Sequence, residues 1–249
     1  MPGWAAALYR LAERALPEAA GRGGVPLNRV IDLHKGLTGP LVFALMAAFG
    51  VWTTPAWIYL ALHGSYGVAW VLKDVTLPDR KWQRRVTWPA AAAAWIFLTH
   101  YWVAPALLIL ASAGVLELGA WSPASGPVLA AAVAVYAIGL VLMLGADVQK
   151  NLTLALRERD GGAGGGLIQS GFFARARHPN YLGEMMVYAA FALVVDHWIP
   201  WIILLAVWVL VFIPNMLAIE ASVSRHPGYE AWRRRTGFLL PKPGGTGDG

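Results

Sequence analysis

The sequence predicts an all-α integral membrane protein, a bundle of about 6–7 transmembrane helices. Of its 249 residues 57% are hydrophobic and only 14% are charged, whereas a soluble domain carries about a quarter charged residues to cover its surface. Apolar stretches long enough to span a bilayer, about 20 residues each, recur along the chain. The 13 Trp and 8 Tyr residues are typical of a protein that lines two membrane–water interfaces.

Six apolar segments can be drawn, at roughly 40–53, 55–73, 86–116, 126–149, 181–195 and 199–222. Pro55 separates the first two. Pro105 lies inside the long third segment, which is therefore expected to be tilted or kinked. No repeat and no soluble domain is evident. We therefore expect one membrane domain, residues 39–249, after an N-terminal segment of residues 1–38.

The positive charges are confined to four regions, and this predicts the orientation. All 20 Lys and Arg residues lie in residues 1–38, 73–85 and 150–177 and from Arg225 onward, whereas the loops near 114–125 and 195–199 contain none. The positive-inside rule places the four basic regions, with both termini, in the cytoplasm. Six crossings satisfy the rule without exception. Dividing the third segment into two crossings would split the basic loops between the two sides.

Composition also limits the partners. In residues 1–38, Trp4, Leu8 and Leu11 share one face of an amphipathic helix, which is typical of a helix lying on a membrane. The net charge of +6 sits between apolar runs, which favours anionic lipids or an anionic cofactor over nucleic acid. The chain has no Cys, so disulfides, thiolate catalysis and Cys-based metal sites are excluded. We predict no metal site and no obligate protein partner.

The first polar residues suited to ligand binding or catalysis lie near the end of the fourth segment. Asp147, Lys150 and Asn151 lie three and four residues apart, so they share one face of a helix. Lys150 alone is equally well explained as a side chain that reaches from the helix end to the interface. Asp147 precedes the apolar boundary and needs a paired or wet site.

A second polar group surrounds the start of the next helix, where Pro179 suits the first turn. Arg175, Arg177 and His178 precede it. Their charge and the free N–H groups of a helix start form an anion site suited to phosphate. Asn180 and Glu184 follow on one face. Alternatively, the arginines anchor the protein to the membrane and Glu184 pairs with one of them.

The C-terminal region adds a basic segment that begins at Arg225, includes Tyr229 and ends in a run of three arginines, 233–235. One interpretation is a basic tail held against anionic lipid. The other is a lid that closes over a phosphate-bearing ligand.

In this order the motifs resemble the C-terminal domain of the steroid 5α-reductase (3-oxo-5α-steroid 4-dehydrogenase) family and related sterol reductases. The matching residues are Asp147-Val-Gln-Lys150, Gly171-Phe-Phe173, Arg177-His-Pro-Asn-Tyr-Leu-Gly-Glu184, Glu220 and the run from Tyr229 to Pro241. Arg-His-Pro-x-Tyr is also found in isoprenylcysteine carboxyl methyltransferases, which use S-adenosylmethionine. The Asp-x-Gln-Lys and Asn-Tyr-Leu-Gly-Glu elements favour the reductases.

The resemblance implies an oxidoreductase that binds NADPH in a cytoplasm-facing pocket formed by residues 140–249. By position, Asn180 and Glu184 hold the nicotinamide carboxamide, and Asp147 and Asn151 lie along the cofactor. The phosphates and the adenosine half are expected to contact Arg175, Arg177, His178, Tyr181, Arg225 and Tyr229. Lys150, Arg157 and Glu220 complete the expected set. A ribose 2′-phosphate needs extra positive charge, which favours NADPH over NADH.

The N-terminal half departs from the family, because residues 1–80 lack its Gln-Glu pair. Tyr66 is the nearest equivalent of the proton-donating tyrosine, and His63 lies three residues away on the same helix face. Polar groups at membrane depth are functional by default, although Tyr66, His63 and His100 equally suit hydrogen bonds between helices. His34-Lys35-Gly36 is expected at the membrane interface.

The expected activity is hydride transfer from NADPH to the C=C bond of an α,β-unsaturated ketone in a steroid or similar lipid, with Tyr66 and His63 as the catalytic pair. One alternative is an S-adenosylmethionine-dependent methyltransferase of the isoprenylcysteine or phospholipid type. A third is a non-catalytic membrane protein whose polar cluster only anchors its helices.

Overall fold

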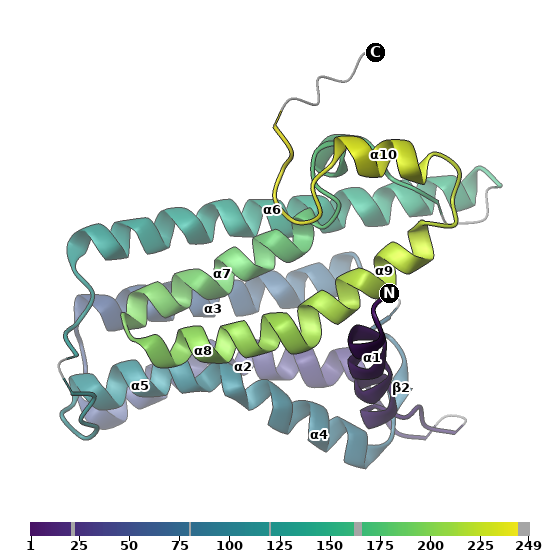
Figure 1. Cartoon of the computed structure of the whole chain (residues 1–249). Helices are drawn as coiled ribbons and strands as arrows, with labels where there is room; N and C mark the ends of the chain where they lie inside the picture. The colour runs from purple at the N-terminus through teal and green to yellow at the C-terminus, as the bar shows by residue number, and fades with distance from the viewer. Residues whose placement is uncertain (21–22, 80, 120, 162–165, 244–249) are drawn as a thin grey trace. The chain divides into compact units, whose positions relative to one another are not determined.

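The computed structural model describes residues 1–20, 23–79, 81–119, 121–161 and 166–243, and this part of the chain is mainly helical (Figure 1). The predicted all-α class is confirmed. The sheet found in it pairs two-residue strands, β1 (Val25–Pro26) and β2 (Arg85–Val86), antiparallel. The helices, in chain order, are α1 (Gly3–Ala15), α2 (Leu27–Phe49), α3 (Thr54–Thr76), α4 (Trp88–Leu98), η1 (Thr99–Trp102), α5 (Val103–Ser112), α6 (Gly126–Arg159), η2 (Gly171–Ala174), α7 (Pro179–Val195), α8 (Trp198–Val207), η3 (Trp208–Phe212), α9 (Ile213–Val223) and α10 (Tyr229–Arg235).

Within the described residues, four helical stretches are long and apolar enough to cross a membrane: Leu27–Phe49, Trp88–Ser112, Gly126–Arg159 and Trp198–Val223. This makes the chain an integral membrane protein. Helix α7 is apolar but shorter, with 17 residues. Helix α3 has 23 residues but carries His63, Tyr66, Lys73 and Asp74, which lower its mean hydropathy. Six crossings therefore remain a prediction.

Local sequence signals explain where several helices begin and end. Helix α2 ends at Gly50, whose φ of 66° is the left-handed conformation that glycine adopts at little cost. Helix α4 begins after Thr87, whose side chain accepts a hydrogen bond from the Ala90 N–H. Pro55 and Pro179 stand in the first turns of α3 and α7, where a proline loses no helical hydrogen bond.

Two boundaries differ from the prediction. Helix α2 begins at Leu27, well before residue 40, because Pro40 lies inside the helix and does not start it. Membrane helices tolerate such prolines. Helix α6 continues to Arg159, into the predicted loop 150–177, of which residues 162–165 lie outside the described part. The third segment is a single stretch interrupted by η1, next to Pro105, whose missing N–H favours a break.

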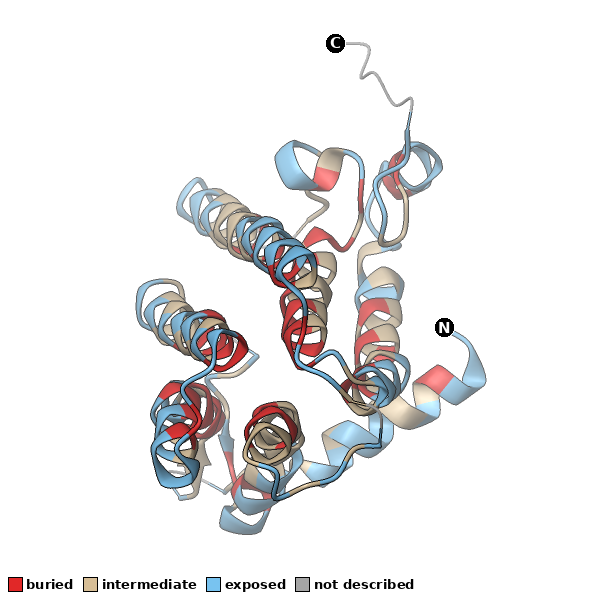
Figure 2. Cartoon of the chain, turned by 90° about the vertical axis from the view of Figure 1, so that its left-hand side faces the viewer, coloured by how far each residue is buried: buried red, intermediate tan, exposed pale blue. Residues whose placement is uncertain are grey.

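The chain divides into two compact units, each with its own core. We call residues 10–136 and 188–206 the N-terminal unit, and residues 1–9, 137–187 and 207–249 the C-terminal unit. In each, buried residues line one side of a helix and exposed residues the other (Figure 2). One buried cluster of the N-terminal unit joins α2, β2 and α4 and consists of Leu27, Val30, Ile31, Val86, Ala90 and Ala91.

Glycines allow helices of each unit to approach closely. In the N-terminal unit, a Cβ atom on Gly67 of α3 would lie 2.3 Å from the Lys35 carbonyl oxygen of α2. In the C-terminal unit, a Cβ atom on Gly183 of α7 would lie 2.4 Å from the Met143 backbone nitrogen of α6. Such distances exclude any side chain, so these glycines hold α2 against α3 and α6 against α7.

Candidate functional site

The N-terminal unit contains a buried lysine surrounded by aromatic residues. Lys35 of α2 donates hydrogen bonds from its Nζ to the hydroxyl oxygens of Tyr66, at 2.6 Å, and Tyr188, at 3.1 Å. The two hydroxyl oxygens lie 3.3 Å apart, and the Lys35 Nζ also lies 3.6 Å from the centroid of the Trp70 ring. The exposed fractions of Lys35, Tyr66 and Tyr188 are 6%, 1% and 3%. We call these three residues the Lys35 cluster.

His63, predicted to act with Tyr66, lies beside it but bonds elsewhere. The ring centroids of His63 and Tyr66 are 6.3 Å apart. The Nδ1 atom of His63 lies 3.0 Å from the Tyr59 hydroxyl, and its ring stacks on Phe191 at 4.1 Å. Among the contacts seen, the hydrogen-bonding neighbours of Tyr66 are Lys35 and Tyr188, not His63. His63 forms part of an aromatic wall.

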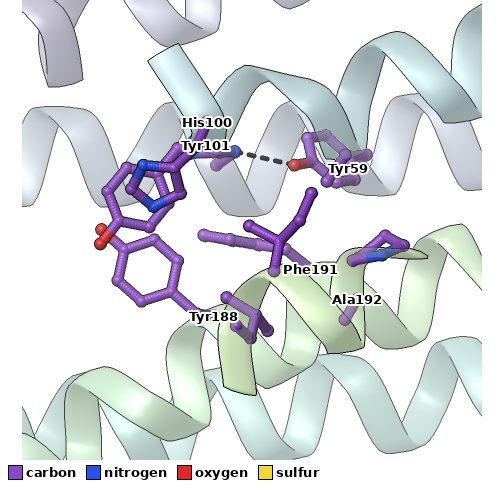
Figure 3. A pocket seen from close by; sticks show the side chains of 11 residues that line it. Tyr59, His100, Tyr101, Tyr188, Phe191 and Ala192 are labelled. Atoms are coloured by element: carbon purple, nitrogen blue, oxygen red, sulfur yellow. Dashed lines mark hydrogen bonds between the residues drawn. The ribbon is translucent and has the colours of Figure 1, made fainter. Parts of the chain in front are cut away.

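A small hollow lies against this wall (Figure 3). Its volume is about 20 Å³, enough for one water-sized group. Tyr101 and Tyr188 stack with their centroids 4.4 Å apart and 11° between their planes. The lining residues are Tyr59, His63, His100, Tyr101, Ala104, Tyr188, Phe191, Ala192, Pro200, Ile203 and Leu204. A larger ligand enters only when these side chains move.

Sequence reasoning missed Lys35 and Tyr188 as members of this site. It placed Lys35 at the membrane interface because the first apolar segment was taken to begin at residue 40. In the structure Lys35 lies eight residues after the start of α2 at Leu27 and is buried. The available signal was Tyr188, four residues after Glu184 on the same predicted helix face.

In the C-terminal unit, part of the predicted cofactor set gathers where α6 and α7 are close. Asn180 donates a hydrogen bond from Nδ2 to Asp147 Oδ1 at 3.1 Å, and Lys150 Nζ lies 3.8 Å from the same oxygen. Asp147 is 6% exposed. One turn further along α6, the buried Nδ2 atom of Asn151 has no hydrogen-bond acceptor among the described residues. Glu184 is half-buried on α7.

Another part of that set forms an internal network around Glu220 of α9. The Oε2 atom of Glu220 accepts hydrogen bonds from Arg177 Nε at 3.0 Å and from the Tyr229 hydroxyl at 2.7 Å. The Nε2 atom of His178 lies 3.3 Å from Oε1 of the same carboxylate. Arg177 also donates from Nη1 to the Thr236 carbonyl at 2.9 Å. These residues therefore hold one another.

The network attaches the C-terminal segment to the residues that precede α7. The Trp232 indole N–H donates to the Phe173 carbonyl at 2.8 Å, and Ala176 and Gly237 form a parallel β-bridge. Tyr229 and Trp232 of α10 pack with Ala146 and Phe173 in one buried cluster. The predicted lid is thus a segment packed against the rest of its unit.

Burial shifts the pKa of two residues of the network. It raises the pKa of Tyr229 to about 12, and the neighbouring Glu220 carboxylate acts in the same direction, so the Tyr229 hydroxyl keeps its proton and donates it. Burial also lowers the pKa of His178 below 6.5, although Glu220 opposes the shift. His178 is therefore neutral at pH 7.

The remaining predicted residues are more dispersed. Arg157 donates to the Leu167 carbonyl at 3.2 Å, and Arg225 to the Ser222 carbonyl at 3.3 Å. Tyr181 packs edge-on against Phe212 and His178. Arg175 is exposed. Within the described ranges, no group of three or more His, Asp or Glu residues is placed to hold a metal ion.

Two comparisons with known proteins bear on this arrangement. A segment of 56 residues is 41% identical to an uncharacterized protein of Schizosaccharomyces pombe. The match spans 22% of this chain and 19% of that relative, so it covers a fragment of both. Residues 31–236, which include the Lys35 cluster and the Glu220 network, match the family described as "Protein of unknown function (DUF1295)". The chain belongs to this DUF1295 family.

Proposed function

We propose that this protein is an NADPH-dependent membrane reductase that transfers a hydride to the C=C bond of an α,β-unsaturated ketone in a lipid-soluble substrate, as its likeness to steroid 5α-reductases implies. The observation that carries the proposal is the Lys35 cluster: an amine and two phenols, all more than nine-tenths buried and bonded to one another. A buried polar group is costly in a membrane helix and marks function by default.

The chemistry of the Lys35 cluster suits a ketone. The Lys35 ammonium donates to both phenol oxygens, so each phenol keeps its own hydroxyl hydrogen, which it can donate to a substrate carbonyl when one binds. As negative charge develops on that oxygen, a nearby cation in a water-poor site stabilises it more strongly than water would. Tyr66 then acts as the general acid, while His63 shapes the wall on which the substrate packs.

The C-terminal unit offers donors that fit a nicotinamide dinucleotide. The buried Nδ2 of Asn151 is a donor with no acceptor among the described residues, and Lys150 and the exposed Arg175 supply positive charge. We assign Asp147, Asn180 and Glu184 to the carboxamide end. When bound, NADPH supplies the hydride.

The Glu220 network plays a different part in this proposal. Arg177, His178 and Tyr229 are engaged with Glu220 or with backbone carbonyls, so they position the segment before α7 and α10 instead of contacting phosphate. Arg175 and Arg225, with exposed side chains, are left as the phosphate contacts. NADPH is a cytoplasmic metabolite, so we place this unit's polar face in the cytoplasm, in agreement with the charge distribution.

Ligand-dependent thermal unfolding of the detergent-purified protein tests the cofactor. Ligands that bind only the folded state raise the unfolding midpoint, because they stabilise that state by about 2.7 kcal/mol at a concentration 100 times the Kd. Stabilisation by NADPH, and not by NADH or S-adenosylmethionine, supports the reductase. Stabilisation by S-adenosylmethionine alone would assign the protein to the methyltransferases, and no response to any of them contradicts both.

Replacing Tyr66 tests the catalytic assignment. We expect Tyr66→Phe to lower NADPH oxidation with a lipophilic enone by about 100-fold or more, while NADPH still raises the unfolding midpoint. Tyr136→Phe is the matched control, since Tyr136 is also buried and bonds only Ser65 among the contacts seen. Equal turnover in both variants would remove Tyr66 from the mechanism.

A further inference from the structure

The reaction proposed above consumes a proton in every cycle, and the groups that would supply it are buried. Hydride addition to the β-carbon converts the enone into an enolate, and Tyr66 then gives up its proton to the enolate. Lys35 returns a proton to the tyrosinate. Because Lys35, Tyr66 and Tyr188 are at most 6% exposed, the proton lost by Lys35 must reach it from water through other groups that accept and donate protons.

A row of such groups leads away from Lys35 within the N-terminal unit. Tyr188 accepts a hydrogen bond from Lys35 at 3.1 Å and stacks on Tyr101. Figure 3 shows the hydroxyl groups of these two rings at the same end of the stack. The ring of Tyr101 in turn contacts the ring of His100, with 3.8 Å between their centroids.

His100 is suited to the outer end of this row. It is only half-buried and lies in η1, the 3₁₀ turn that interrupts the stretch Trp88–Ser112; such mid-helix turns often mark a mobile point. It also lies within electrostatic range of Lys35 and His34. Imidazole takes up and releases protons near neutral pH more readily than any other side chain.

The hydrogen bonding of His100 shows which nitrogen is available. Its Nδ1 contacts the Phe97 carbonyl oxygen, which can only accept, so Nδ1 carries the hydrogen. In the neutral ring Nε2 is then the basic nitrogen, and this buried atom has no partner in the part of the chain that the structure describes. A free basic nitrogen on the inner side of a half-exposed ring can carry a proton inward.

We propose that His100 supplies protons to the Lys35 cluster by way of Tyr101 and Tyr188. Each cycle moves one proton from water to the half-buried His100 ring, from His100 through the two phenols to Lys35, and from Lys35 to the Tyr66 oxygen. No electrons move along the row. The proposal rests on the reductase function for its purpose, but the route itself is a property of the N-terminal unit.

Deuterium exchange tests the route without any turnover. The protein is diluted into D₂O, and infrared spectroscopy follows exchange of the Lys35 ammonium, identified by its loss in Lys35→Met. We expect His100→Phe to slow this exchange by about tenfold or more. The control is His197→Phe, a histidine of the same unit outside the row, whose Nδ1 accepts from the Ile199 N–H. Equal exchange rates in all three proteins would overturn the proposal.

Kinetics with an enone distinguish a proton carrier from a structural residue. In His100→Phe the first turnover should keep its rate, because Tyr66 is already protonated, while steady-state turnover falls about tenfold or more. Imidazole added to His100→Ala should restore steady-state turnover. Equal losses in both phases would contradict a proton-transfer role. If the wild-type protein reduces no enone, the reductase proposal fails, and the exchange experiment still decides the route.

Tyr101→Phe provides a second variant in case His100→Phe does not fold. It keeps the ring that stacks on Tyr188 and removes only the hydroxyl. We expect the same slowing of exchange and the same difference between first and later turnovers. Wild-type behaviour in both measurements would exclude the route through Tyr101.

Discussion

At the scale of single residues, the polar groups of this protein are buried in two different ways. Lys35 is held by phenols, which accept its hydrogen bonds, and by the face of the Trp70 ring. Glu220 is held at Oε2 by a guanidinium and a phenol, and an imidazole lies near its Oε1. The first arrangement suits the proton transfer proposed above, and the second holds chain segments together.

Replacing Lys35 should show how much its positive charge contributes to turnover. We expect Lys35→Met to reduce enone turnover by about 100-fold or more, because the enolate loses the cation that stabilises it. Stabilisation by NADPH should persist. The matched control is Lys73→Met, since the Nζ of Lys73 also lies over the Trp70 ring, 4.7 Å from its centroid. Full activity of Lys35→Met would show that the amine plays no part in turnover.

His178 predicts how stability depends on pH. Its lowered pKa keeps the folded protein from binding a proton that the unfolded chain binds below about pH 6.5. The stabilisation is therefore present above that pH and is lost as the pH falls toward the folded-state pKa. The wild-type unfolding midpoint should fall more steeply than that of His178→Gln between pH 7.5 and about pH 5.5. Parallel curves for the two proteins would contradict this assignment.

At the scale of elements, close helix approach positions the Lys35 cluster. Gly67 lets the backbone of α3 touch the Lys35 carbonyl of α2, and a Cβ atom on Gly39 would lie 3.2 Å from Gly64 Cα. Small residues allow such close approach in membrane helices. Because lipid provides no hydrophobic driving force between two helices, their association depends on close packing of the backbones. The Lys35–Tyr66 bond of 2.6 Å depends on that approach.

Adding a methyl group at Gly67 should therefore destabilise the protein and impair the Lys35 cluster. Its Cβ atom would lie 2.3 Å from the Lys35 carbonyl oxygen, so α2 and α3 must separate, at a cost of about 1–3 kcal/mol. We expect Gly67→Ala to lower both the unfolding midpoint and turnover. Gly36→Ala is the control, because its Cβ atom would meet Val71 at an ordinary 3.7 Å. If the two variants unfold alike, the close contact is not essential.

At the scale of the whole molecule, charge and hydropathy predict the orientation in the membrane. The loops expected outside the cytoplasm contain no Lys or Arg, while four other regions contain all 20. An odd number of crossings would place some of these regions on the wrong side of the membrane, against the positive-inside rule. The four long apolar stretches leave α3 and α7 to complete an even count of six.

Single cysteines can test this orientation directly, because the chain has none of its own. We expect a membrane-impermeant maleimide to label Ser122→Cys in intact cells and Lys81→Cys or Lys242→Cys only in inverted vesicles or after permeabilisation. Labelling of Lys81→Cys in intact cells would reverse the assigned orientation. Labelling of Lys81→Cys and Lys242→Cys from opposite sides would exclude six crossings.

The sequence by itself determined the class of this protein and most of its helices, because hydropathy, helix starts and charge distribution are local properties. It also identified Asp147, Asn180 and Glu220 as candidate cofactor-binding residues. It misplaced the start of α2 because a proline inside a membrane helix reads like the beginning of a segment. It therefore left Lys35 at the membrane interface, although this residue proved to be buried.

Only the tertiary structure decided which of these polar residues belong together. Lys35 bonds residues 31 and 153 positions away along the chain, and Arg177 bonds Glu220, 43 positions away. Helical periodicity tells which side chains share a face of one helix, but it does not tell which faces meet. That choice is made by backbone contacts such as the one at Gly67 and by the need to pair every buried polar group.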